Sequence, residues 1–139
     1  MIKLLSQSDK ETFAFGQRLA ADFCGGEVLA VYGDLGAGKT VLAKGIARGL
    51  GIKSRINSPT FNIMKVYPVK GHKSIKQFCH IDAYRLHSAQ DLESIGFADY
   101  CNHSTVVLIE WADRVKGLLK NAQKIRISHL QGDLREILY

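Results

Sequence analysis

The 139-residue sequence is poor in several residue types that mark particular classes of protein. It has two prolines and no Pro- or Ser-rich stretch, which argues against a linker or a low-complexity segment. Its three cysteines, Cys24, Cys79 and Cys101, form no C-x-x-C pair, so they fit reduced thiols better than a disulfide framework or a zinc knuckle. No apolar run approaches the ~20 residues that a membrane-spanning helix needs.

Two more absences concern location and charge. The first residues, MIKLLSQSDKET, lack the apolar core of a signal peptide, and we therefore expect a cytoplasmic protein without membrane contact. The formal net charge is +6, yet the sequence has no block of five basic residues and no basic–aromatic pattern of the RNA-recognition type. The charge suits a nucleic acid or an acidic protein partner, and a solvated basic surface is the simpler interpretation.

The most informative stretch that is present is GDLGAGKT, residues 33–40, which matches G-x-x-x-x-G-K-[ST] at every constrained position. The apolar run 27–32 before it predicts a buried strand. Leu42, Ile46 and Leu50 after it have the spacing of one face of a helix. Strand, glycine loop and helix are the context in which this motif holds nucleotide phosphates.

Each part of this loop suits a polyphosphate. Backbone N–H groups can surround the phosphate oxygens, and the glycines allow the tight turn. The helix that begins after Gly38 adds its positive dipole end, Lys39 offers a mobile positive charge, and the Thr40 hydroxyl is a ligand for Mg²⁺. The loop residues predicted to contact the nucleotide are Asp34, Leu35, Gly36, Ala37, Gly38, Lys39, Thr40 and Val41.

A phosphate-loop enzyme also needs an acid at the end of a second buried strand. Glu110 follows the apolar run 105–109, and Asp82 follows the run 78–81. One acid would hold the metal and the other would order the attacking water, and spacing alone does not assign the two roles. His80 and Asp82 share a strand face, where a hydrogen-bonded pair is the favoured interpretation over a transition-metal site.

The nucleotide base and the rate are partly predictable. The N-K-x-D strand end of guanine-specific proteins is absent, which favours adenine. No arginine stands at an obvious finger position. Because an arginine finger is worth ~10³ to 10⁵ in rate, we expect slow hydrolysis by the chain alone.

The remaining pattern indicates an α/β protein. Ser8 to Glu11 is a capping box that begins a helix. Further ranges predict a strand hairpin, a short helix, a buried strand and two strands near the C-terminus: 62–69 with 75–81, 88–95, 105–109, 124–128 and 135–139. We therefore predict one P-loop ATPase domain over residues 1–139, a P-loop NTPase-type three-layer domain with a mixed central sheet flanked by helices.

Five short motifs in one order resemble a known family: GDLGAGKT, then SPTF at 58–61, HIDAYRL at 80–86, DLESIG at 91–96 and IEW at 109–111. The chain is similar in these to the TsaE (formerly YjeE) family, small bacterial ATPases of tRNA threonylcarbamoyladenosine biosynthesis. The resemblance implies ATP and Mg²⁺ as cofactors and a TsaB–TsaD pair as partner. That pair modifies the adenosine beside the anticodon in tRNAs that read codons beginning with A, so tRNA is reached through the complex.

The resemblance also implies roles for individual residues. It assigns the metal to Thr40 and Glu110, and hydrolysis to Asp82 with Lys39. It places Thr60 in a switch-like segment near the γ-phosphate and makes Asp9, in the first helix, an adenine contact. Val41 departs from the family, which often has threonine there.

Two other functions remain open from the sequence. A small-molecule kinase would use the same loop, but the hairpin expected from the region 61–81 leaves little chain for an arginine-bearing lid. An adaptor would hold ATP through Lys39 without useful turnover. Trp111, the single tryptophan, would either stack on a partner or base or shield the edge of the site.

Overall fold

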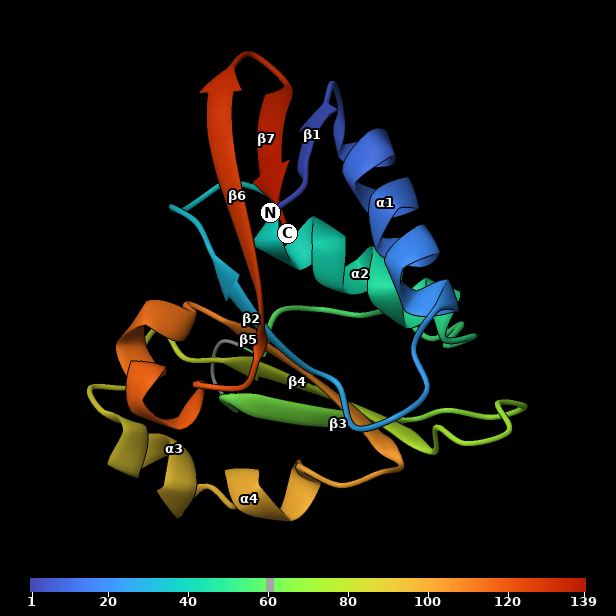
Figure 1. Cartoon of the computed structure of the whole chain (residues 1–139), viewed down its shortest axis with the longest axis vertical. Coiled ribbons are helices and arrows are strands. Elements are labelled where there is room, and N and C mark those ends of the chain that lie inside the picture. The colour runs from blue at the N-terminus through green and yellow to red at the C-terminus, as the bar shows by residue number, and fades with distance from the viewer. Residues whose placement is uncertain (60–61) are drawn as a thin grey trace.

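A computed structural model describes residues 1–59 and 62–139, which form a mixed sheet flanked by helices (Figure 1). The elements are, in chain order, β1 (Lys3–Ser6), α1 (Asp9–Ala21), β2 (Val28–Tyr32), α2 (Lys39–Gly49), β3 (Met64–Pro68), β4 (Gln77–Asp82), α3 (Ala89–Ser94), α4 (Phe97–Tyr100), β5 (Thr105–Glu110), the 3₁₀ helix η1 (Ala112–Leu118), β6 (Gln123–Gln131) and β7 (Leu134–Leu138). In these residues the sheet has seven strands in the order β1-β7-β6-β2-β5-β4-β3.

The centre of the sheet is parallel. β2 pairs in parallel with β5 and β6, and β5 pairs in parallel with β4. β3, β7 and β1 are added to the two sides as antiparallel strands. The carboxyl ends of β6, β2, β5 and β4 therefore share one edge of the sheet, where open α/β proteins bind their ligands.

Alternating side chains of the central strands divide the core into two clusters. Leu29 and Val31 of β2 pack with the apolar residues of α1 and α2. Ala30, between them, packs with the residues of α3, α4 and η1. Successive residues of β2 thus point to opposite faces of the sheet, and both faces are buried. The sheet is therefore the middle of three layers. This confirms the expected mixed sheet flanked by helices.

Small residues hold α1 close against α2. A Cβ atom at Gly45 would lie 2.2 Å from the Phe13 carbonyl oxygen, and one at Gly16 would lie 2.7 Å from the Leu42 carbonyl oxygen. Only glycine allows the two backbones this approach. The contact fixes α2, and with it the loop that precedes α2.

The structure adds elements that the sequence did not predict. β1 is four residues long and pairs with β7, from Lys3↔Leu138 to Ser6↔Arg135. Such a short segment lacks a periodicity of its own, and its partner lies at the other end of the chain. α4 has only four residues, and η1 is a 3₁₀ helix interrupted by non-helical backbone at Val115, so neither has the spacing of a regular helix. In the described residues, no helix is long and apolar enough to cross a membrane.

Candidate functional site

The glycine loop joins β2 to α2 at the shared edge of the sheet. A Cβ atom at Gly33 would lie 2.6 Å from the Ile127 carbonyl oxygen, so the loop passes against β6 as only glycine can. Gly38 has φ +111° and is the N-cap of α2, whose first turn closes with Leu42 N–H on the Gly38 carbonyl at 3.0 Å. The amides before Leu42 have no partner within the helix, which is the arrangement that binds anions.

Lys39 is buried at the base of the loop, with 5% of its surface exposed. Its Nζ donates to the carbonyl oxygens of Gly33 at 2.6 Å and Asp34 at 2.8 Å, and lies 4.0 Å from the centroid of the Trp111 ring. Burial lowers the pKa of Lys39, and the negative charges of Glu110 and Asp34 oppose that shift. The amine can exchange these carbonyls for phosphate oxygens without leaving the loop.

Thr40 and Glu110, to which the resemblance assigns the metal, lie within hydrogen-bond distance of each other. Thr40 Oγ1 donates to Glu110 Oε1 at 2.9 Å, and the other oxygen, Oε2, lies 2.5 Å from His80 Nε2. His80 is fully buried, and its Nδ1 has no hydrogen-bond partner among the described residues. Thr40 of α2 and His80 of β4 therefore hold the Glu110 carboxylate of β5 in one orientation.

This donor set fits Mg²⁺. A hydroxyl and a carboxylate are hard oxygen ligands, and Mg²⁺ in phosphate sites takes few protein ligands and keeps several waters. In the described part of the chain, no group of three or more His, Cys, Asp or Glu side chains is placed to hold a metal ion. A lightly ligated cation shared with phosphates fits Thr40 and Glu110 better than a dedicated protein cage.

Asp82 lies beside Glu110, its register partner at the ends of β4 and β5. Asp82 Oδ1 accepts from the Tyr84 backbone N–H and Oδ2 accepts from Ser58 Oγ, both at 3.0 Å. His80 and Asp82 thus use different partners and do not form the pair considered from the sequence. Ser58 was quoted in a motif but not predicted as a site residue, and the predicted Thr60 lies outside the described residues.

One cavity of about 580 Å³ collects most of the predicted residues. Its lining residues are Asp9, Leu35, Gly36, Gly38, Lys39, Thr40, Val41, Ser58, Asp82, Tyr84, Glu110, Trp111 and Arg135. Two predicted loop residues do not line it. Ala37 is fully buried and its N–H donates to the Asp34 carbonyl, and Asp34 lines a separate hollow.

Arg135 is a cavity residue that the sequence did not indicate. It stands on β7, and its Nε donates to the Ala37 carbonyl of the loop at 3.0 Å, across 98 positions of sequence. Its Nη1 donates to the Gly132 carbonyl at 3.3 Å. A lone arginine in a C-terminal strand carries no local signal, because the β6–β7 hairpin reaches the loop only through the pairing of β6 with the distant strand β2.

Aromatic side chains form one wall of the cavity. The ring centroids of Tyr84 and Trp111 are 4.9 Å apart, and the Arg114 guanidinium lies 5.4 Å from the Tyr84 ring. Trp111 has φ +58°, which turns the chain directly after Glu110. Trp111 is half-buried over Lys39, so within the chain it shields the edge of the site.

The fold and this edge define a class: a mixed α/β protein whose glycine loop, lysine and strand-end acids open into one cavity. Residues 6–137 match the family model described as threonylcarbamoyl adenosine biosynthesis protein TsaE. The chain belongs to the TsaE family. This confirms the resemblance drawn from the five motifs.

Individual relatives agree with this assignment. The chain is 37% identical over 139 residues to the tRNA threonylcarbamoyladenosine biosynthesis protein TsaE of Bacillus subtilis, covering 99% of this chain and 84% of that protein. It is 37% identical to the protein of the same name from Haemophilus influenzae, over 76% of this chain and 64% of that protein, just under two thirds of its length. The crystal structure of Bacillus subtilis YdiB superposes with a TM-score of 0.78 at 35% identity, covering 98% of this chain and 82% of that one.

Proposed function

We propose that this chain is a single-domain, magnesium-dependent ATPase of the P-loop type that serves tRNA threonylcarbamoyladenosine biosynthesis in the cytoplasm, together with a TsaB–TsaD pair. The observation that carries the proposal is the meeting of Lys39, Thr40, Asp82 and Glu110 in one cavity beside the N-terminus of α2. Membership of the TsaE family and the names of the relatives support the pathway.

Binding follows from the loop. The first-turn amides of α2 and the Lys39 amine would surround the β- and γ-phosphates, and Thr40 and Glu110 would hold Mg²⁺. Bound Mg²⁺ neutralises the charge on the phosphate oxygens. Asp9, at the first position of α1, lines the same cavity and is the proposed adenine contact.

Asp82 is the residue proposed to act on the attacking water. Asp82 is 8% exposed and lines the cavity, where its carboxylate would orient a water toward the γ-phosphorus and accept a proton as the water oxygen forms its bond. The bond between the γ-phosphorus and the bridging oxygen breaks, releasing ADP and inorganic phosphate. Ser58 Oγ and the Tyr84 amide fix the carboxylate during this step.

ATP hydrolysis by the isolated chain should be slow. Arg135 is the one arginine of the described residues that lines the cavity, and its guanidinium donates to the carbonyls of Ala37 and Gly132. A finger supplied by a partner is worth ~10³ to 10⁵ in rate. The kinase alternative has less support, because the region expected to supply a lid instead contains β3 and β4, paired as a hairpin within the sheet.

The test is ATP hydrolysis by the purified chain alone, with the TsaB–TsaD pair, and with the pair and tRNA. We expect slow release of phosphate alone and a higher rate with the pair, together with threonylcarbamoyl transfer to tRNA over many turnovers. Phosphate transfer to an added metabolite would favour a kinase. ATP binding without hydrolysis under all three conditions would favour an adaptor and refute the ATPase proposal.

A further inference from the structure

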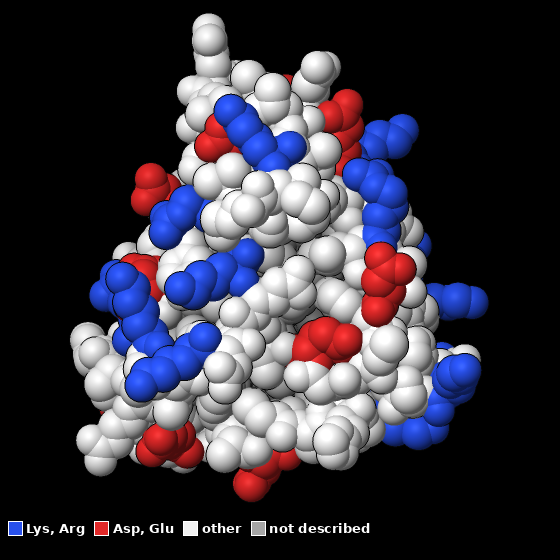
Figure 2. All heavy atoms as spheres, viewed as in Figure 1, with Lys and Arg blue, Asp and Glu red and all other residues white. Residues whose placement is uncertain are grey.

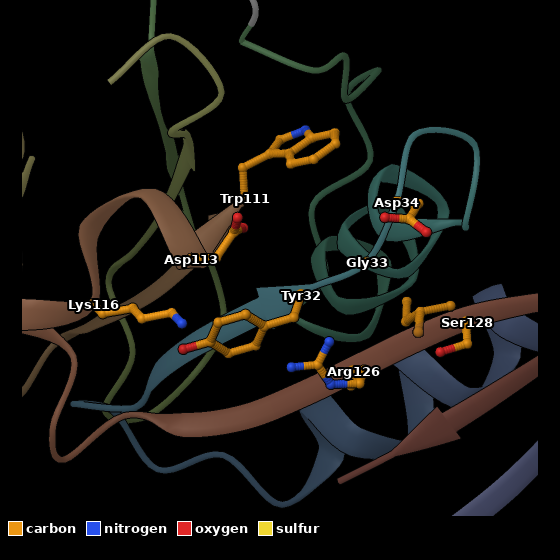
Figure 3. Close-up of a pocket in the computed structure, with 9 residues that line it drawn as sticks. Tyr32, Gly33, Asp34, Trp111, Asp113, Lys116, Arg126 and Ser128 are labelled. Atoms are coloured by element: carbon orange, nitrogen blue, oxygen red, sulfur yellow. The ribbon is translucent and has the colours of Figure 1, made fainter. Parts of the chain in front are cut away.

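A second concave surface lies beside the glycine loop (Figure 3). One hollow of about 280 Å³ is lined by Tyr32, Gly33, Asp34, Trp111, Asp113, Lys116, Arg126, Ile127 and Ser128. A second of about 280 Å³ is lined by Met1, Tyr32, Lys116, Leu119, Lys120, Lys124 and Arg126. Because Tyr32, Lys116 and Arg126 line both, the two hollows form one continuous surface, here called the Tyr32 trough.

Positive charge gathers along the trough. Lys116 on η1, Lys120 after it, and Lys124 and Arg126 on β6 are all exposed. Among the described residues none of the four forms an ion pair with a carboxylate. Figure 2 shows Lys and Arg side chains clustered over the side of the molecule where η1 and β6 lie, at the left of the view. Unpaired cations in a concave surface attract a polyanion.

An aromatic ring lies between the cations. Tyr32 and Arg126 are register partners of β2 and β6, and the Arg126 guanidinium lies 5.3 Å from the Tyr32 ring centroid. Figure 3 shows the Lys116 amine and the Arg126 guanidinium on either side of this ring. Cations that hold a phosphate backbone next to aromatic rings are the arrangement by which proteins bind single-stranded nucleic acid.

The opposite wall carries hydrogen-bond acceptors. Asp34 and Asp113 are exposed there, and Ser128 adds a hydroxyl on β6, the strand of Arg126 (Figure 3). A ligand that suits the whole trough has phosphates for the cations and N–H or O–H donors for the carboxylates. A nucleotide has both, through its phosphates, base amino groups and ribose hydroxyls. An acidic peptide fits less well, because its carboxylates would face those of Asp34 and Asp113.

We propose that the Tyr32 trough is a binding site for a single-stranded segment of RNA. The proposal rests on the proposed function only in naming tRNA as the RNA that binds. The chemistry of the trough stands without it. It makes the chain itself an RNA-binding partner within the modification machinery.

The trough shares a wall with the ATP cavity. The carbonyls of Gly33 and Asp34 accept the two hydrogen bonds of Lys39 Nζ, and both residues line the trough. A phosphate that draws the amine into the ATP cavity releases these carbonyls. Nucleotide and RNA would therefore change each other's affinity by the same factor, as linkage requires.

The test measures binding of a fluorescent tRNA transcript, and of a single-stranded RNA oligonucleotide, as a function of salt. The trough variant is Lys116→Gln with Arg126→Gln. Its matched control is Lys44→Gln with Arg48→Gln, which removes the same charge from a separate hollow whose lining has no acidic side chain. Tyr32→Leu removes the aromatic ring while keeping an apolar side chain on β2.

We expect the trough variant to weaken RNA binding about tenfold or more. The slope of log affinity against log salt concentration should become shallower by about two, because two cations are removed. Tyr32→Leu should weaken it about tenfold through lost stacking. The control should bind RNA within about twofold of the unchanged chain. Both double variants should keep ATP hydrolysis and thermal stability, since neither pair touches the ATP cavity, so loss of RNA binding is separable from failure of the proposed ATPase.

Two results would overturn the proposal. One is RNA affinity of the trough variant equal to that of the control. The other is displacement of RNA by poly-glutamate as effective as displacement by unlabelled RNA at equal charge concentration, which would make the trough a surface for an acidic protein.

Discussion

Glu110 is held at both carboxylate oxygens, by Thr40 on one side and His80 on the other, before any cation arrives. A ligand already oriented loses little freedom when it binds a metal. The Thr40 hydroxyl is the member of this group that must turn from Glu110 toward the cation. The cation site is therefore best tested at Thr40, where the backbone and the helix are unaffected.

We expect Thr40→Val to raise the Mg²⁺ concentration needed for half-maximal hydrolysis by about tenfold or more, because it removes a hard oxygen ligand at nearly constant volume. Thr40→Ser, which keeps the hydroxyl, is the matched control and should stay within about threefold of the unchanged chain. The measurement is phosphate release against Mg²⁺ at saturating ATP. Equal Mg²⁺ dependence of the two variants would show that the hydroxyl holds no metal.

Asp82 accepts hydrogen bonds from the Ser58 hydroxyl and the Tyr84 backbone amide, both neutral donors. We expect Asp82→Asn to keep the fold and to leave the Kd for ATP within about twofold, because the side chain keeps its shape. The hydrolysis rate should fall by about 10²–10³, since an amide cannot accept the proton of the attacking water. Binding is followed by the fluorescence of Trp111, the single tryptophan, which lines the same cavity.

Ser58→Ala is the companion variant for Asp82. It removes one of the two hydrogen bonds that fix the carboxylate and should lower the rate by a smaller factor. An unchanged rate in Asp82→Asn would remove Asp82 from the hydrolysis step and leave Glu110 as the remaining strand-end acid of the cavity.

At the scale of the elements, the sequence predicted the parts whose signals are local. β2, the loop and α2 follow one another within residues 27–50, so strand pattern, glycines and helix period lie in one stretch. β5 was visible as an apolar run with Glu110 at its end. β1 was not, because its partner β7 lies at the other end of the chain. The place of Arg135 was not, because it depends on β6, the hairpin partner of β7, pairing with the distant strand β2.

The close packing of α1 against α2 is another feature whose physical reason could not be predicted from the sequence. Glycine inside a helix usually weakens it, and a sequence pattern alone does not show why Gly45 stands there. The structure gives the reason as the backbone of α1 against that position. The position of α2, and of the glycine loop that precedes it, therefore depends on Gly45 having no side chain.

We expect Gly45→Ala to lower the free energy of unfolding by about 1–3 kcal/mol, because the added Cβ would lie 2.2 Å from the Phe13 carbonyl and must push α1 away. Lys44→Ala, an exposed change on the same helix, should stay within about 0.5 kcal/mol. Urea denaturation followed by circular dichroism measures both. Stabilisation by Gly45→Ala would mean that helix propensity outweighs the close contact.

For the molecule as a whole, the two faces of the sheet contribute differently to the site. The cluster under α1 and α2 supports the glycine loop, and the cluster under α3, α4 and η1 supports the strand ends that carry Asp82 and Glu110. The site needs both clusters intact, so conditions that weaken either should reduce ATP binding together with stability. Cys79 offers a way to weaken one of them without touching the site.

Cys79 on β4 is fully buried in the second cluster, and this burial, with a smaller effect of Cys101, raises the pKa of its thiol from 9.0 to about 12. The folded state therefore keeps the proton where the unfolded chain releases it. The thiol's contribution to stability is complete below pH 9 and is lost as pH rises from 9 toward 12. Between pH 9 and 11 we expect a loss of about 2 kcal/mol in the unfolding free energy from this group.

Comparison of variants isolates that contribution from the other groups that titrate at high pH. Cys79→Ala starts less stable near neutral pH because a buried atom is removed, but its deficit relative to the unchanged chain should shrink between pH 9 and 11. Cys24→Ala, at an exposed thiol, should follow the unchanged chain throughout. The measurement is urea denaturation at a series of pH values. A constant deficit across that range would show that the Cys79 thiol ionises as readily in the fold as in the unfolded chain.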